Sequence, residues 1–262
     1  MSFGTIKAID SETMIESSTA SLRYIFVLTY GRSGSTLFMK LLNHFPGAEI
    51  RGENNNALFH LYKSIQRITD AHKDHGFRDK GTENPWFGAS QMAPDKFTRA
   101  CLDSFVTDVL APSKNTTVTG FKEIRHMPDH MSDEEFTGYA AFILEHFPGA
   151  KIVFLTRDAE KVSQSGWFKK RPPTEVIPMV RASDERFRAF CENRDDCVVL
   201  DHDDVVKNGE ALMDVISFLG FRPDTDVAED VLSVQLNHVK ELPQNASSIL
   251  QALKRYVRKV LR

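Results

Sequence analysis

The sequence contains few cysteines and no long apolar run. Its three cysteines, Cys101, Cys191 and Cys197, are odd in number and widely spaced, which is neither a disulfide framework nor a zinc-binding pattern. We therefore expect a reducing environment and a cytoplasmic location. No apolar stretch is long enough to span a bilayer, and residues 1–21 lack the basic and apolar regions of a secretory signal. No integral membrane segment is expected.

A large excess of charge is also absent. The 262 residues include 33 Lys and Arg against 36 Asp and Glu, a net charge of −3. Such a chain is not expected to bind nucleic acid or an anionic membrane as a whole, so any basic site must be local. The apolar share of 41% and the charged share of 26% are typical of globular proteins, and the length suits one large domain.

Buried-strand patterns alternate with helical patterns along most of the chain. This alternation predicts an α/β fold with a mostly parallel sheet covered by helices on both faces. No linker interrupts it, so we expect one domain over 1–262. Residues 54–115 lack strand patterns and are predicted to be a helical or loop insertion, or a lid. The expected strands are 24–30, a short segment before Glu53, 117–125, 151–157 and 197–204. The expected helices are 34–45, 57–70, 95–110, 133–147, 158–169, 176–193, 210–221 and a basic tail, 247–262. Ser132 and Glu135 form the expected capping box of the helix 133–147.

The segment GRSGST, residues 31–36, joins an expected strand to an expected helix. A helix N-terminus carries free N–H groups and a positive dipole end, which favour a bound anion. Gly31 and Gly34 let the backbone approach closely, and Arg32 adds a forked cation that matches phosphate or sulfate oxygens. Three hydroxyl side chains add donors: Ser33, Ser35 and Thr36. The pattern predicts an anion cradle, with a simple Gly/Ser turn as the alternative. It is not a Walker A loop, which needs a lysine before the hydroxyl.

The segment GRSGSTL resembles the 5′-phosphosulfate-binding loop of sulfotransferases, which use 3′-phosphoadenosine 5′-phosphosulfate (PAPS) as donor. Because these enzymes are structural relatives of P-loop kinases, the resemblance implies a P-loop NTPase-like three-layer fold. The arginine in the loop is similar to the carbohydrate and tyrosyl-protein branches, and the expected cytoplasmic location suggests a bacterial relative. Residues 198–221 resemble a structural segment of the family, so the resemblance runs from about residue 24 to 221.

A second match lies in KIVFLTRDAEKVSQSGWFK, residues 151–169. The family binds the 3′-phosphate with an arginine at a strand end and a serine eight residues later, on the following helix. Arg157 and Ser165 have this spacing. Lys169 matches a further basic residue of some branches and would share a helix face with Ser165. The alternative is an Arg157 that only pairs with Asp158 or another surface acid.

The resemblance also implies catalytic residues. Glu53 matches the glutamate that is the base in the carbohydrate and tyrosyl-protein branches, with Glu49 as its nearest competitor. Lys122 matches a lysine that stabilises the leaving phosphate, and such a cation favours the transition state because the charge develops only as the S–O bond breaks. Arg32 completes this catalytic set.

Two further residues near Lys122 are alternatives for the base. His126 corresponds to the region where the small-phenol branch has a histidine, although a lone histidine is expected on the surface. Glu123 is the other alternative, and it is otherwise expected to pair with Arg125 or to orient substrate.

These features together imply transfer of a sulfuryl group from PAPS to an acceptor hydroxyl by in-line displacement. The resemblance suggests a carbohydrate, glycolipid or similar small-molecule acceptor, and residues 54–115 are either a simple insertion or a lid over its site. Trp86 and Trp167 either line this acceptor site or anchor packing. No metal is expected, because a sulfuryl group carries less negative charge than a phosphoryl group. Four other histidines are not spaced as metal ligands are: His60, His72, His75 and His130.

Two rival functions remain. In an atypical P-loop nucleotide kinase, Asp201 would take the place of the Walker B aspartate, although the missing Gly-Lys-Ser/Thr argues against it. A non-catalytic module would keep the nucleotide site and transfer nothing, and only turnover distinguishes it from an enzyme.

Overall fold

The computed structural model describes residues 22–79, 81–203 and 209–222. Within these ranges five strands form one sheet in the order β2-β3-β1-β4-β5, and all neighbouring strands are parallel. The expected α/β fold is confirmed, and the described sheet is wholly rather than mostly parallel. The strands are β1 (Arg23–Leu28), β2 (Ala48–Arg51), β3 (Val118–Glu123), β4 (Lys151–Thr156) and β5 (Cys197–Asp201).

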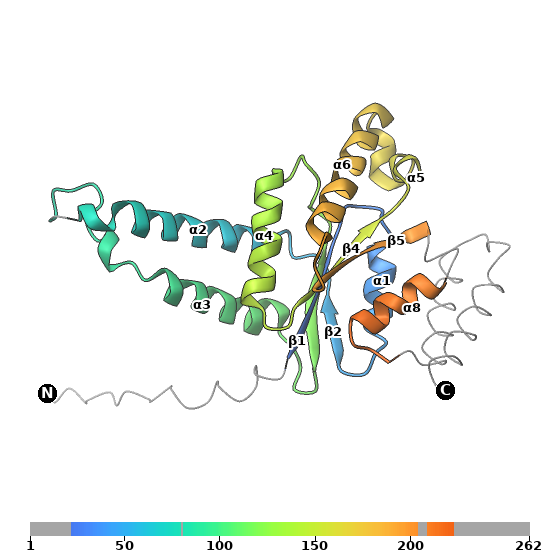
Figure 1. The fold of residues 1–262 in the computed structure, drawn as a ribbon, viewed down its shortest axis with the longest axis horizontal. Helices are drawn as coiled ribbons and strands as arrows, with labels where there is room; N and C mark the ends of the chain where they lie inside the picture. Colours follow the sequence, from blue (N-terminus) through green and yellow to red (C-terminus); the bar gives the residue numbers. More distant parts are fainter. Residues whose placement is uncertain (1–21, 80, 204–208, 223–262) are drawn as a thin grey trace, which may run out of the picture.

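Helices connect the strands and cover the sheet (Figure 1). α1 follows β1, α2 and α3 lie between β2 and β3, α4 follows β3, α5 and α6 follow β4, and α8 follows β5. The α-helices are α1 (Ser35–Leu42), α2 (Ala57–His75), α3 (Pro94–Ser104), α4 (Asp133–His146), α5 (Ala159–Ser163), α6 (Pro173–Cys191) and α8 (Gly209–Phe218). The shorter helical turns are η1 (Gly76–Arg78), η2 (Ala89–Gln91), the π-helical η3 (Phe105–Leu110) and η4 (Gly166–Lys170).

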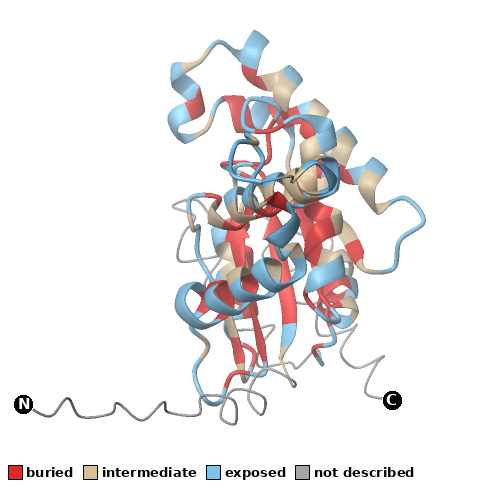
Figure 2. Ribbon diagram, turned by 90° about the vertical axis from the view of Figure 1, so that its left-hand side faces the viewer, coloured by how far each residue is buried: buried red, intermediate tan, exposed pale blue. Residues whose placement is uncertain are grey.

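Both faces of the sheet are buried, and burial is concentrated in the strands and the helix sides that face them (Figure 2). Phe26 and Phe154 belong to the core beneath α4 and α6. Their neighbours in the same strands, Val27 in β1 and Val153 in β4, belong to the core beneath α1 and α8. Because successive side chains of a strand point to opposite faces, a continuous apolar run serves both cores. The result is three layers.

The continuous helix expected over 158–169 is wrong. α5 ends at Ser163, Ser165 is extended, and a new helical turn begins at Gly166. Gly166 has a φ of 55°, a left-handed conformation that a right-handed helix does not accept. Ser165 and Lys169 therefore do not share a helix face.

The other boundaries differ from expectation by a few residues, and the strands are slightly shorter than expected. α2 continues to His75. The helix expected over 95–110 changes from α to π at Phe105. α6 begins at Pro173, where a proline fits the first helical turn. The tail helix expected at 247–262 lies outside the described residues.

The expected capping box of α4 is confirmed. The Ser132 hydroxyl accepts the backbone N–H of Glu135 at 3.1 Å, and the Glu135 carboxylate accepts the backbone N–H of Ser132 at 3.0 Å. These two bonds satisfy donors that a helix N-terminus leaves unpaired. They fix the start of α4 at the carboxyl edge of the sheet.

α2 and α3 form an arm that projects away from the sheet (Figure 1). We refer to residues 57–104 as the α2–α3 arm. Its base is buried through Leu58 and Leu102, whereas Phe77 and Phe87 in the connection between the helices are exposed. The described part of the 54–115 segment contains helices and turns and no strand.

Gly120 offers a test of the sheet. It lies in β3 between Ile25 of β1 and Ile50 of β2, with a φ of 152°, and a Cβ there would overlap the carbonyl oxygen of Ile25. We predict that Gly120→Ala lowers the free energy of unfolding by more than about 3 kcal/mol, or prevents folding, because the strands must separate. Urea denaturation measures this.

Gly149→Ala is the matched control. Gly149 also has a positive φ, 65°, but a Cβ there would meet nothing within 4 Å. Only the left-handed strain remains, roughly 1–2 kcal/mol. If both variants lost the same free energy of unfolding, the overlap of the Cβ added at Gly120 with β1 would not be the cause of the loss in Gly120→Ala.

Candidate functional site

The anion cradle lies at the carboxyl edge of the sheet, between the end of β1 and the start of α1. Arg32 and Gly34 both adopt positive φ, 69° and 91°, and α1 begins at Ser35. The first N–H groups of a helix have no partner within the helix, so this end of α1 presents donors to a bound anion. Strand, turn and helix therefore lie where the sequence predicted them.

Two rings that the motif did not predict flank this loop. A Cβ on Gly31 would overlap the indole of Trp167, and a Cβ on Gly34 would overlap the imidazole of His202. The Arg32 guanidinium lies 5.8 Å from the Trp167 ring centre, and half of Trp167 remains exposed. Close packing thus requires glycine at both positions, and the left-handed φ of Gly34 is a second reason there. Burial holds the pKa of His202 below its usual value, with Arg157 adding to the effect.

The predicted 3′-phosphate residues lie beside the same loop. Arg157 Nη1 donates to the Arg32 carbonyl at 2.9 Å, and Arg32 Nε donates to the Ser165 hydroxyl at 2.9 Å. The two motifs, about 125 residues apart, are therefore joined directly. Lys169 lies in η4 and is exposed, and no hydrogen bond or ion pair among the described residues links it to Arg157 or Ser165.

Three buried polar atoms of this region have no hydrogen-bond partner among the described residues: the Ser33 hydroxyl, Arg157 Nε and His202 Nδ1. Two of them, the hydroxyl of Ser33, a residue only 1% exposed, and Arg157 Nε, are donors that suit an anion. A buried donor without a partner is costly, about 1–3 kcal/mol, so a sulfate or phosphate oxygen would satisfy these groups. Ser35 is buried and Thr36 is exposed at the start of α1. These residues fit a phosphosulfate group.

Lys122 and Glu53 form an ion pair next to the cradle edge. Lys122 lies in β3 with its side chain 5% exposed, and Glu53 follows β2 with its side chain 41% exposed. A buried ammonium group needs such a partner, because desolvation of an unpaired charge is unfavourable. The structure thus brings together the predicted base and the predicted cation for the leaving group, with the base on the accessible side.

Glu123 holds the loop that carries Glu53. Its carboxylate is fully buried and accepts the backbone N–H groups of Asn54 at 3.3 Å, Asn56 at 2.8 Å and Ile124 at 2.8 Å. This role of Glu123 was not predicted from the sequence, which suggested a pair with Arg125 or a contact with substrate. The run of three asparagines was a usable signal, since asparagine tolerates positive φ, and two of the three adopt it.

His126 is buried and not on the surface, which corrects the expectation. Its Nδ1 lies 3.1 Å from the Thr29 carbonyl, and its ring stacks on Tyr139. Burial lowers the pKa of His126 to about 4. His126 and Glu123, the two alternative bases, are both buried.

The other acidic candidates are occupied by structural contacts. Glu49 pairs with Arg51 and accepts the Ser113 N–H, each at 3.1 Å, and hydrogen bonding from Ser113 lowers the pKa of Glu49. Asp201 accepts the Thr156 hydroxyl at 2.9 Å and so joins the ends of β4 and β5.

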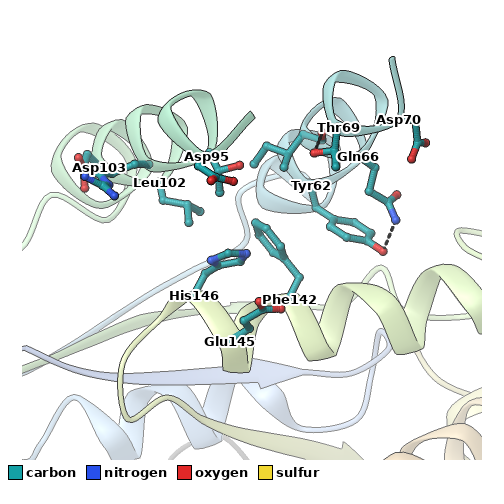
Figure 3. Close-up of a pocket in the computed structure, with 13 residues that line it drawn as sticks. Tyr62, Gln66, Thr69, Asp70, Asp95, Leu102, Asp103, Phe142, Glu145 and His146 are labelled. Atoms are coloured by element: carbon teal, nitrogen blue, oxygen red, sulfur yellow. Dashed lines mark hydrogen bonds between the residues drawn. The ribbon is translucent and has the colours of Figure 1, made fainter. Parts of the chain in front are cut away.

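A separate pocket of about 680 Å³ lies between the α2–α3 arm and the end of α4 (Figure 3). α4 runs from the carboxyl edge of the sheet to the amino edge, so Glu145 and His146 in its last turn lie at the opposite edge from the cradle. The pocket is therefore not part of the anion site. Its lining residues are Tyr62, Ile65, Gln66, Thr69, Asp70, Asp95, Thr98, Arg99, Leu102, Asp103, Phe142, Glu145 and His146.

The described ranges contain no group of three or more His, Cys, Asp or Glu side chains arranged to hold a metal ion. None of the described helices is both long and apolar enough to cross a membrane.

Comparison with known proteins decides the family. The sequence model of the sulfotransferase family matches residues 24–224. The chain belongs to the sulfotransferase family. The family implies PAPS as the donor. Membership in it decides against both the atypical kinase and the non-catalytic module. A search of curated proteins found no match for the chain.

Three solved structures of low sequence identity are similar to this sulfotransferase, and the first of them shares its fold. The sulfotransferase domain of the Synechococcus PCC 7002 olefin synthase is 17% identical, with a TM-score of 0.51 over 89% of this chain and 94% of that domain. A sulfotransferase of Mycobacterium avium is 12% identical (TM-score 0.42, 91% of this chain and 77% of that one). A sugar kinase of a Janibacter species is 15% identical (TM-score 0.37, 80% and 98%).

The buried His126 predicts how stability depends on pH. In the folded protein the pKa of His126 is about 4, below the ordinary value of 6.5. Between pH 6.5 and 4, His126 therefore binds a proton in the unfolded chain but not in the folded protein. Stability from this group is therefore lost as the pH falls through that window. We predict that His126→Asn, which keeps a donor for Thr29, shows a smaller loss between pH 7 and pH 5 in urea denaturation. The same pH slope in both proteins would contradict the assignment.

Proposed function

We propose that this sulfotransferase moves the sulfuryl group of PAPS to an acceptor hydroxyl with Glu53 as the general base. The observation that carries the proposal is the Lys122–Glu53 ion pair beside the anion cradle. A base must lie close to the group being transferred, and Lys122 is the buried cation in contact with Glu53. The partly exposed Glu53 side chain is open to an acceptor.

The donor is assigned to two parts of the carboxyl edge. The loop of residues 31–36 and the first turn of α1 receive the 5′-phosphosulfate, with donors from Arg32, Ser33, Gly34, Ser35 and Thr36. Arg157 and Ser165 receive the 3′-phosphate. Lys169 is a weaker candidate, because no hydrogen bond or ion pair within the described ranges joins it to either residue. The Arg157–Arg32 and Arg32–Ser165 hydrogen bonds support one continuous binding surface.

The chemistry is an in-line displacement at sulfur. The acceptor oxygen forms a bond to sulfur while the bond between sulfur and the bridging oxygen of the donor breaks, and the acceptor proton passes to the Glu53 carboxylate. The products are a sulfate ester and 3′,5′-bisphosphoadenosine. Lys122 stabilises the charge that develops on the bridging oxygen. An anionic donor competes with Glu53 for Lys122, so donor binding would free the base for its task.

The acceptor is proposed to approach from the side of the α2–α3 arm. Glu53 lies in the connection that leads directly into α2, so the arm begins a few residues after the base. The arginine loop and the glutamate base favour a carbohydrate, glycolipid or similar small molecule, by resemblance to the carbohydrate branch. Trp167 exposes a ring face at the rim of the cradle, a surface that suits a sugar ring.

Glu53→Gln tests the base. The amide keeps the shape and can still accept a hydrogen bond from Lys122, but it cannot take a proton. We predict that kcat for sulfuryl transfer falls by about 10²- to 10⁴-fold, while the dissociation constant of 3′,5′-bisphosphoadenosine changes little. Transfer is measured by release of the bisphosphate in the presence of an acceptor.

Glu49→Gln is the matched control, because Glu49 lies four residues earlier and contacts Ser113 and Arg51 instead. Its kcat should stay near that of the wild type. Full transfer by Glu53→Gln would rule out Glu53 as the base.

A further inference from the structure

The Tyr30 hydroxyl joins three elements beneath the donor site. Tyr30 is fully buried and directly precedes the cradle. Its hydroxyl accepts the backbone N–H of Arg157, at the end of β4, at 2.8 Å, and lies 2.8 Å from Asp184 Oδ1, in α6. One side-chain atom therefore connects the loop that is assigned to the phosphosulfate with the residue that is assigned to the 3′-phosphate.

The partners of the Tyr30 hydroxyl determine which hydrogen bond it accepts and which it donates. The Arg157 N–H can only donate, so the Tyr30 oxygen must accept there and its own proton is free for another acceptor. The Tyr30 hydroxyl donates a hydrogen bond to the Asp184 carboxylate at 2.8 Å, and the Arg157 carbonyl at 3.2 Å is the competing acceptor. Burial raises the pKa of Tyr30 far above its usual value, which keeps the hydroxyl protonated.

Asp184 is suited to this task because it is a partly buried acceptor. Burial raises the pKa of Asp184 to about 6, while the hydrogen bond from Tyr30 and the nearby Arg188 oppose the rise. At neutral pH it is an ionised carboxylate that can accept and not donate. A charge-assisted hydrogen bond of this kind is stronger than a neutral one.

We propose that Asp184, acting through Tyr30, is a positioning residue for the Arg157 clamp on the 3′-phosphate. The inference rests on the proposed function. Arg157 is anchored at its backbone by Tyr30 and at its guanidinium by the Arg32 carbonyl, and its Nε has no partner among the described residues. Loss of the backbone anchor would let the guanidinium move away from the phosphate. No contact of Asp184 with the donor is required.

The test is calorimetric titration with 3′,5′-bisphosphoadenosine and, separately, with ADP, which lacks the 3′-phosphate. Tyr30→Phe and Asp184→Ala should each weaken bisphosphate binding by about 3- to 10-fold, the equivalent of one hydrogen bond, and leave ADP binding almost unchanged. Asp184→Asn keeps an acceptor oxygen and should restore most of the affinity. In Tyr30→Phe, the further change Asp184→Ala should have no added effect, because the two residues act in series.

Arg157→Ala separates the two possible failures. If the wild type does not prefer the bisphosphate to ADP, or if Arg157→Ala binds both as the wild type does, the proposed function fails. If Arg157→Ala loses the preference but Tyr30→Phe and Asp184→Ala retain it, the positioning role is overturned and the proposed function stands. Equal weakening of both ligands, or additive effects in the double variant, would also overturn it. Tyr30→Phe decides the question if Asp184→Ala does not fold.

Discussion

A charge removed from water must be paired, and this constraint organises the end of β3. Lys122 and Glu123 follow one another in the strand, so their side chains point to opposite faces of the sheet. Lys122 pairs with Glu53, and Glu123 accepts the N–H groups of Asn54 and Asn56. The same loop is therefore held from both faces, and the candidate base is fixed next to the candidate cation by the protein itself.

Features that depend on neighbours in sequence were predictable. The Ser132–Glu135 capping box was visible as a four-residue pattern, and it forms as expected. The segment HFPGA occurs at residues 44–48 and again at 146–150, and its glycine adopts a left-handed φ both times, 77° at Gly47 and 65° at Gly149. The alternation of apolar runs with helical periodicity predicted the parallel sheet, and with it the edge where the cradle and Arg157 meet, because parallel strands all end at one edge.

Features that depend on distant residues were not predictable. The burial of His126 requires the Tyr139 ring, from the following helix, and the Thr29 carbonyl, from a neighbouring segment. The helix break at Gly166 is coupled to the Arg32 side chain, whose Nε and Cδ a Cβ at Gly166 would crowd. In each case a local pattern had one ordinary outcome, a surface histidine or a continuous helix, and a tertiary contact selected another.

We propose that this edge of the sheet binds a nucleotide that carries a 3′-phosphate, and that the loop without a Walker A lysine holds the anion at its 5′ end. Calorimetric titration of the wild-type enzyme with 3′,5′-bisphosphoadenosine, beside ATP with Mg²⁺, tests it most directly. The account predicts that the bisphosphate binds at least about tenfold more tightly, a difference of about 1.4 kcal/mol. Tighter binding of ATP with Mg²⁺, or equal binding of the two, would contradict it.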